Sequence, residues 1–218
     1  MAYLAGIKII LDIEFSEIDE KEAEQYLSNI VKKYAELIFD QKLELSIHLD
    51  EGSLKINIAI IGALYLAIGQ YGSFRSGIDY LIKDSKTLTN IVVSELVRNG
   101  VSDSDIIESS KHHCIPDKVR RVLLAIDRLE SKKNLSQIEI KKELSKIKTS
   151  IKNICVHLKE KDIGLFATSI PAKYLPEDSE IPQIATRYKL AAREEDIKFF
   201  PIASFDKLQV NKSFKQDK

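Results

Sequence analysis

Apolar and polar residues alternate near the start of the chain. Every second residue from Ile7 to Phe15 is apolar, and the intervening positions are mostly charged. A period of two predicts a strand buried on one face. Residues 43–49 and 54–60 alternate in the same way. The turn-forming residues Asp50 to Ser53 separate these two segments, so they are predicted to form a β-hairpin.

Between these strands the apolar residues recur at helical spacing. Ser16 and Asp19 resemble a capping box for a helix whose apolar stripe runs from Ala23 to Ile38. Helical spacing returns over residues 64–82, and a further helix is predicted over 87–98. Ser102–Asp105 is predicted to cap a short helix through Ile107.

The next segment contains the pattern of a helical hairpin. Pro116 suits the first turn of a helix, and Ser136 with Glu139 forms a capping box for a second, longer helix. The apolar positions of the longer helix are spaced four and three residues apart, which is a heptad seam. We predict that this seam is an interaction surface; its members are Ile140, Leu144, Ile147, Ile151, Ile154 and Leu158.

Four prolines interrupt the chain after residue 170. A short strand is predicted over residues 163–170, and residues 184–192 and 199–210 are predicted to be strands or docked extended chain. The predicted fold class is α+β: a strand-helix-strand-strand sheet packed by helices, then a helical hairpin and an irregular C-terminal segment. The predicted divisions are an α+β domain (1–100), a helical region (101–162) and the C-terminal segment (163–218).

Charge is balanced overall but unevenly distributed. The 33 basic residues equal the 33 acidic ones, which argues against a uniformly basic nucleic-acid binder. Residues 12–51 contain twelve acidic and four basic residues, a net −8, whereas residues 118–161 contain thirteen basic and five acidic residues, a net +8. Two solvated helical faces explain this pattern; electrostatic self-association or a phosphate-binding face are the alternatives.

The uncharged run from Ile56 to Phe74 has about the length of a membrane span. Its first part alternates as a strand, and its glycines and polar residues dilute its hydrophobicity. A strand that leads into a buried helix is therefore the preferred interpretation. The two cysteines do not form a disulfide framework, and the N-terminus lacks the features of a secretory signal, so we expect a cytoplasmic protein. The content of Ile and Lys suggests a bacterial source.

A glycine-rich segment follows within the same region. Gly69, Ser73 and Gly77 are spaced four residues apart, which allows a second element to approach a helix closely. Together with Arg75 they are alternatively a candidate anion site. The spacing matches neither phosphate-loop nor dinucleotide-binding motifs.

The basic segment has one further interpretation. Residues 135–144 resemble the positioning helix of a winged-helix domain, and residues 149–151 with 158–163 resemble its recognition helix and the approach to its wing. This resemblance implies DNA binding, with Lys146, Lys148 and Lys152 as candidate phosphate contacts. The heptad seam, however, continues through the position of the turn and favours one uninterrupted helix.

Catalytic and cofactor-binding motifs are absent from the sequence, and no catalytic residue, cofactor or metal is predicted. Cys114, Cys155 and the neighbouring histidines lack the spacing of a zinc site. We therefore expect a non-enzymatic interaction or scaffolding protein, acting as a homo-oligomer or through a protein partner. The alternatives are a nucleic-acid binder that uses residues 118–161 and a membrane-associated effector that uses residues 56–74.

Overall fold

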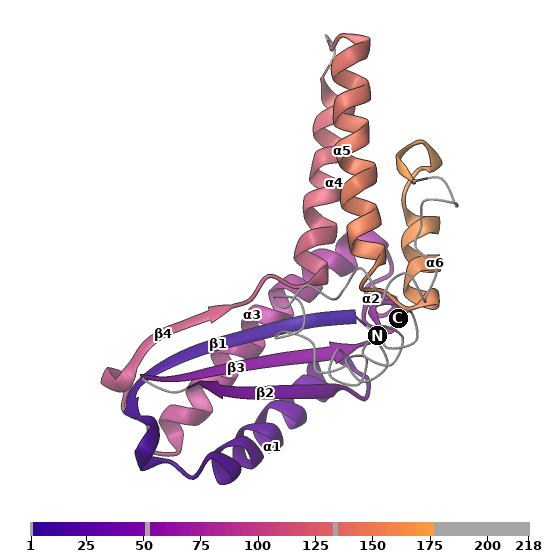
Figure 1. The fold of residues 1–218 in the computed structure, drawn as a ribbon. Helices are drawn as coiled ribbons and strands as arrows, with labels where there is room; N and C mark the ends of the chain where they lie inside the picture. Colours follow the sequence, from indigo (N-terminus) through magenta and orange to yellow (C-terminus); the bar gives the residue numbers. More distant parts are fainter. Residues whose placement is uncertain (1, 51–52, 133–134, 177–218) are drawn as a thin grey trace, which may run out of the picture. The chain divides into compact units, whose positions relative to one another are not determined.

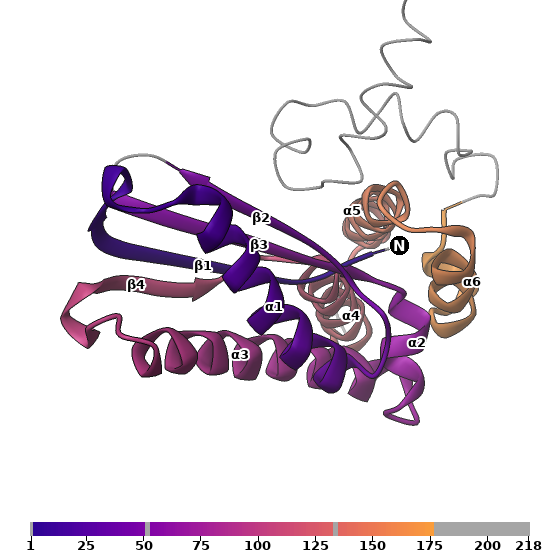
Figure 2. The ribbon, with the colours of Figure 1, turned by 90° about the horizontal axis from the view of Figure 1, so that it is seen from below.

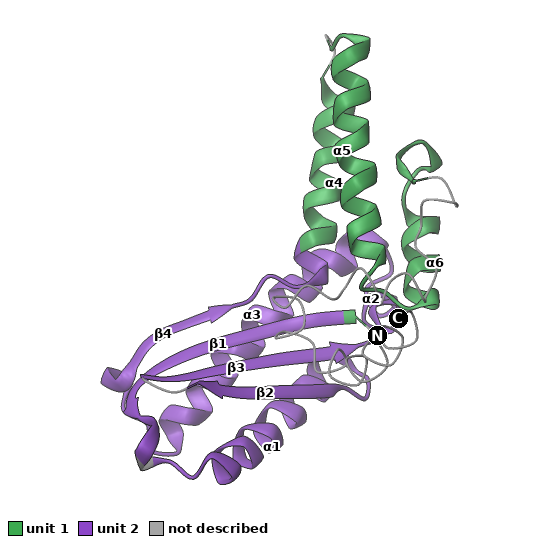
Figure 3. Cartoon of the chain, viewed as in Figure 1, with its two compact units in different colours: residues 1–2, 118–218 green, residues 3–117 purple. Residues whose placement is uncertain are grey.

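The computed structural model describes residues 2–50, 53–132 and 135–176. The chain divides into two compact units at residue 117 (Figure 3). One unit comprises residues 3–117 and contains the sheet. The other comprises residues 1–2 and 118–218 and consists, over its described part, mainly of helices.

The larger unit is a four-stranded antiparallel sheet with helices on one face (Figures 1 and 2). The strands are β1 (Ala2–Glu14), β2 (Glu44–Asp50), β3 (Ser53–Gly62) and β4 (Ile106–Lys111), in the spatial order β2-β3-β1-β4. The helices α1 (Glu20–Phe39) and α3 (Phe74–Arg98) connect β1 to β2 and β3 to β4. This is the split β-α-β arrangement of ferredoxin-like folds. The predicted α+β class, with its N-terminal sheet, is confirmed.

The strands predicted from alternation are present. Ile7 and Ile9 of β1 are fully buried, whereas Lys8 lies on the opposite face. In the β2–β3 hairpin, Ile47 is paired with Ile58 and Leu49 with Ile56, so the apolar residues of both strands share a face. The observed register therefore follows from the sequence pattern.

The start and the buried face of α1 differ from the prediction. Asp19, not Ser16, is the N-cap, and its carboxylate accepts hydrogen bonds from the backbone N–H groups of Lys21 and Glu22. Ser16 lies in the short 3₁₀ helix η1 (Phe15–Glu17). The buried stripe is rotated: Leu27, Val31, Ala35 and Phe39 are buried, whereas Leu37 is 77% exposed.

The helical segment after β3 is interrupted at a different place from the prediction. Helix α2 (Leu64–Gly69) ends before the turn at residues 70–73, and α3 then continues without a break to Arg98. The uncharged run 56–74 is therefore divided among a strand, a short helix and a turn. None of the helices within the described ranges has the length and apolar character needed to cross a membrane.

Strand β4 replaces the short helix predicted after residue 102. A single 3₁₀ turn, η2 (Asp103–Asp105), precedes it, and Ile106 and Ile107 belong to the strand. β4 pairs with β1 at the edge of the sheet, and the register shifts between Ile10 and Leu11. Pairing with a strand about a hundred residues earlier stabilises this mostly polar segment, so its own sequence carries little strand signal.

The smaller unit contains the predicted helical hairpin. Residues 118–131 of α4 (Ile115–Ser131) and α5 (Gln137–Cys155) lie side by side (Figures 1 and 2). The predicted capping box of Ser136 and Glu139 is confirmed at the start of α5. We call residues 118–155 the helical hairpin.

The segment after the hairpin is helical, so the strand predicted over residues 163–170 is wrong. Helix α6 (Glu160–Ser169) is followed by the 3₁₀ helix η3 (Ala172–Tyr174). Asp162, Phe166 and Ile170 are buried at intervals of four residues, which is helical spacing. The strands predicted over 184–192 and 199–210 lie outside the described residues.

Candidate functional site

The heptad seam of the hairpin is buried along only part of its length. Ile147, Ile151 and Ile154 are at most 3% exposed, and Leu158, just beyond the end of α5, is also buried. Towards the start of α5, Leu144 is half-buried and Ile140 is 41% exposed. The inner part of the seam thus forms the core of the helical unit, and its outer part remains accessible.

A second face of α5 carries lysines. Ile138, Lys141, Lys148 and Lys152 are spaced three, seven and four residues apart, which places them on one side of a helix. The three lysines line a surface hollow of about 330 Å³ together with Leu144, Ser145 and Thr149. Ile138 is 81% exposed. We call Ile138, Lys141, Lys148 and Lys152 the lysine face; no acidic residue belongs to it.

Lys146, the third predicted phosphate contact, does not lie on the lysine face. Lys146 and Lys148 are two residues apart, about 200° around the helix axis. The Lys146 ammonium group is 2.7 Å from a carboxylate oxygen of Glu143. The structure therefore brings Lys148 and Lys152 together and separates Lys146 from them. Helix α5 is also uninterrupted through residues 144–151, where the winged-helix resemblance requires a turn.

The segment after α6 packs back onto the hairpin. The Tyr174 hydroxyl donates a hydrogen bond of 2.9 Å to Glu130, and the Lys173 ammonium group is 3.0 Å from the same carboxylate. These two contacts lower the pKa of Glu130. Tyr174 is 2% exposed. The described part of the C-terminal segment is thus anchored beside the end of α4.

The glycine-rich segment does not form one stripe. Gly69 ends α2, and Ser73 caps α3 by accepting a hydrogen bond from the backbone N–H of Ser76. A Cβ atom at Gly77 would lie 2.8 Å from Cγ2 of Ile68, whereas one at Gly69 would have no atom within 4 Å. Of these two glycines, only Gly77 lies where a second element, α2, packs closely against α3. Arg75 lies in the first turn of α3.

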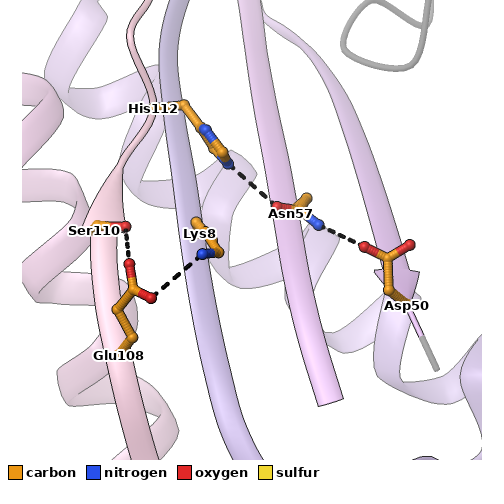
Figure 4. A network of polar contacts seen from close by, with 6 residues as sticks. All are labelled: Lys8, Asp50, Asn57, Glu108, Ser110 and His112. Carbon is orange, nitrogen blue, oxygen red and sulfur yellow. Dashed lines mark hydrogen bonds and ion pairs between the residues drawn. The ribbon is translucent and has the colours of Figure 1, made fainter. Parts of the chain in front are cut away.

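A polar network crosses the sheet on the face opposite α1 and α3 (Figure 4). Asn57 of β3 donates to Asp50 of β2 at 3.0 Å and is 3.2 Å from Nε2 of His112. Lys8 of β1 pairs with Glu108 of β4 at 3.3 Å, and Ser110 donates to the same carboxylate. The contacts involve all four strands. This network was not predicted, because its residues are far apart in the sequence and come together only when the sheet forms.

The pKa shifts in this network follow from its contacts. The hydrogen bonds from Ser110 and Lys8 lower the pKa of Glu108. Burial lowers the pKa of His112, and the charges of Lys8 and His113 act in the same direction. The lowered pKa favours the neutral form of His112, whose Nε2 lies within hydrogen-bond distance of Asn57. Since the polar groups of the network bind one another, we interpret the network as structural: its hydrogen bonds and ion pair hold neighbouring strands together.

Both cysteines are free thiols buried inside the protein. Cys114 is fully buried, and its thiol donates to Asp117 at 3.1 Å. Burial and the charge of Asp117 raise the pKa of the Cys114 thiol above its usual range, which disfavours the nucleophilic thiolate. Cys155 is buried in the helical unit. Within the described residues, no group of three or more His, Cys, Asp or Glu side chains is arranged to hold a metal ion.

Asp117 links β4 to the start of α4. Its carboxylate accepts a hydrogen bond from the backbone N–H of Cys114 and lies 2.5 Å from the Lys111 ammonium group. Burial raises the pKa of Asp117, but the hydrogen bonds from Lys111 and Cys114 lower it by more, and the net shift is downward. The sequence offered a signal for this contact, since Asp117 is three residues after Cys114, as in the second half of a capping box.

Comparisons with known proteins add no relative. The chain matches no family model, no curated protein and no solved structure. The functional argument therefore rests on the geometry of the chain itself.

Proposed function

We propose that this chain is a non-enzymatic interaction protein that binds an acidic protein surface through its helical hairpin. The lysine face of α5 carries this proposal. It presents three lysines and one exposed isoleucine on a single side of a capped helix. A partner with a row of carboxylates and an exposed apolar side chain at one end of the row would match this arrangement.

The charge of the helical unit supports the proposal. Residues 118–176 contain fourteen basic and six acidic residues, a net charge of +8. Such an excess raises the rate of encounter with acidic surfaces and disfavours basic ones. Lys146 contributes less to this field, because Glu143 lies beside it.

The exposed apolar residues support a protein partner in particular. Ile138 is 81% exposed, Leu124 of α4 is 43% exposed and Ile140 is 41% exposed. Burying such side chains favours association by about 25 cal/mol for each Å² of apolar surface removed from water. A free phosphate or a sugar-phosphate backbone would leave these side chains in water.

Site-specific photo-crosslinking in cells tests the proposal. A photoreactive amino acid replaces Ile138, and in a control it replaces Leu37 of α1, which is 77% exposed. We expect a protein adduct at position 138, absent at position 37, whose crosslinked peptide is rich in Asp and Glu. Replacing Lys141, Lys148 and Lys152 by Glu should abolish the adduct. Equal adducts at both positions would contradict the proposal.

Nucleic-acid binding is the second candidate, and the acid-free lysine face favours it. Three lysines along one side of a helix could contact successive phosphates without reading bases. Titration of a labelled oligonucleotide against salt tests this function. Replacing the three lysines by Gln should weaken binding to every sequence alike and reduce the salt slope by about 3. An unchanged affinity for the oligonucleotide would show that the lysine face does not bind nucleic acid.

A further inference from the structure

The larger unit carries the charge opposite to that of the helical unit. Residues 3–117 contain nineteen acidic and eleven basic residues, a net charge of −8, against +8 for residues 118–176. The zero net charge of the chain thus results from two oppositely charged units. This division follows the structural boundary at residue 117.

Six exposed acidic residues of the larger unit lie at one end of the sheet. This is the end where β1 and β2 finish and where β3, β4 and α1 begin (Figure 1). Exposed carboxylates from three segments of the chain meet there. We call this surface the acidic end; its members are Asp12, Glu14, Asp19, Glu20, Glu22 and Asp103.

An exposed apolar residue lies beside these carboxylates. Ile107 occupies the irregularity where β4 shifts its register against β1, and it is 58% exposed. The strand irregularity turns a large apolar side chain outward at a position near Asp103 in the chain. The acidic end thus combines carboxylates with one exposed apolar residue, as the lysine face combines ammonium groups with Ile138.

We propose that the acidic partner of the helical hairpin is a second copy of this chain, whose acidic end docks on the lysine face. This inference rests on the proposed function and names its partner. Ile107 and Ile138 meet at one end of the contact, and the carboxylates pair with Lys141, Lys148 and Lys152 along the rest of it. Because two different surfaces meet, the contact is heterologous, and repeating it produces a ring or an open chain of subunits.

A charge-swap experiment with full-length protein tests this contact. One variant carries K141E, K148E and K152E, and the other carries D12K, E20K and D103K at exposed positions of the acidic end. Each variant alone presents two surfaces of like charge and should be monomeric by light scattering on a sizing column. An equimolar mixture restores opposite charges at both contacts and should assemble, as should the wild type at about 50 mM salt.

A matched control separates the contact from the change in net charge. The variant K32E, K83E and K86E alters three exposed lysines of the larger unit and changes the net charge by the same amount as the lysine-face variant. It should assemble like the wild type, whereas each interface variant should weaken association at least about tenfold. Circular dichroism establishes that all variants are folded.

Failure of this inference is distinguishable from failure of the proposed function. A wild type that stays monomeric up to about 0.1 mM at low salt, or a mixture that fails to assemble, would overturn the self-docking contact. An adduct of position 138 with a different acidic protein would then preserve the proposed function. Absence of both assembly and adduct would overturn both.

Discussion

At the residue scale, two contacts determine how elements join within the larger unit. Asp117 ties the end of β4 to the start of α4 through Lys111 and the Cys114 backbone. Gly77 allows α3 to approach Ile68 of α2, where a Cβ atom would meet the Ile68 side chain at 2.8 Å. Each contact leads to a prediction about the stability of the protein, and neither prediction depends on the proposed function.

Asp117→Asn should destabilise the protein by about 1–3 kcal/mol at pH 7, because a part-buried ion pair and its hydrogen bonds are lost. The pKa of Asp117 is lower in the folded protein than in the unfolded chain, where it is about 3.9. The carboxylate therefore contributes stability above about pH 4, and this contribution is lost as the pH falls through the lower folded value. Urea unfolding should show a difference from wild type that shrinks in acid.

The control for this prediction is Asp12→Asn, which removes the same charge at an exposed site. Its free energy of unfolding should stay within about 0.5 kcal/mol of wild type. A difference for Asp117→Asn that persists unchanged below pH 3 would exclude the ion pair as its cause.

Gly77→Ala should cost about 1–3 kcal/mol of stability, because the new methyl group forces Ile68 to move. Gly164→Ala is the matched control: it lies within α6, and nothing would lie within 4 Å of its Cβ atom. That substitution should raise stability by up to about 1 kcal/mol. Thermal unfolding of both variants measures the difference. Equal effects would show that α2 and α3 do not pack closely at Gly77.

At the scale of elements, two sides of α5 differ in burial and charge. The side with Ile147, Ile151 and Ile154 is buried and holds the unit together. The lysine face points away from this core, with Lys141 exposed and Lys148 and Lys152 half-buried. Because the two sides are separate, a substitution can disturb one side and leave the other intact.

Ile147→Asp should unfold the hairpin, since a charge in this core costs several kcal/mol. Ile138→Asp should leave the fold intact, because Ile138 is 81% exposed. Far-ultraviolet circular dichroism should therefore show a loss of helix for the first variant alone. Light scattering should show weakened assembly for the second. A folded Ile147→Asp variant that still assembles would contradict the assignment of the two sides.

At the scale of the whole molecule, opposite charges of equal size divide between the two units. The sequence isoelectric point is about 6.9. Two regions of opposite charge on a protein without net charge favour attraction between copies. Salt weakens this attraction, because charges separated by more than about 8–10 Å are largely screened at an ionic strength of about 0.1–0.15 M.

The solubility of the wild type should therefore pass through a minimum near pH 7 at low ionic strength and rise as salt is added. The variant K141E, K148E and K152E should be more soluble near pH 7, because its net charge is −6 and its helical unit retains a net charge of only +2. Turbidity measured against pH at two salt concentrations provides the comparison. A minimum that salt does not alter would indicate apolar aggregation.

The sequence by itself determined the elements whose signals are local. Alternation specified β1 and the β2–β3 hairpin because a period of two allows only one register with every apolar residue buried. Ser136 and Glu139 specified the start of α5 because a capping box is completed within four residues. The lysine face could also be deduced from the sequence, since helix geometry separates Lys146 from Lys148.

Tertiary structure decided the remainder. β4 depends on pairing with β1, about a hundred residues earlier, and the polar network of the sheet depends on that same pairing. Residues 163–170 form an uncharged, mainly apolar run that is compatible with strand or helix, and burial of Phe166 and Ile170 at helical spacing distinguishes them. The acidic end likewise exists only in the fold, because antiparallel strand order brings the ends of separate segments to one edge.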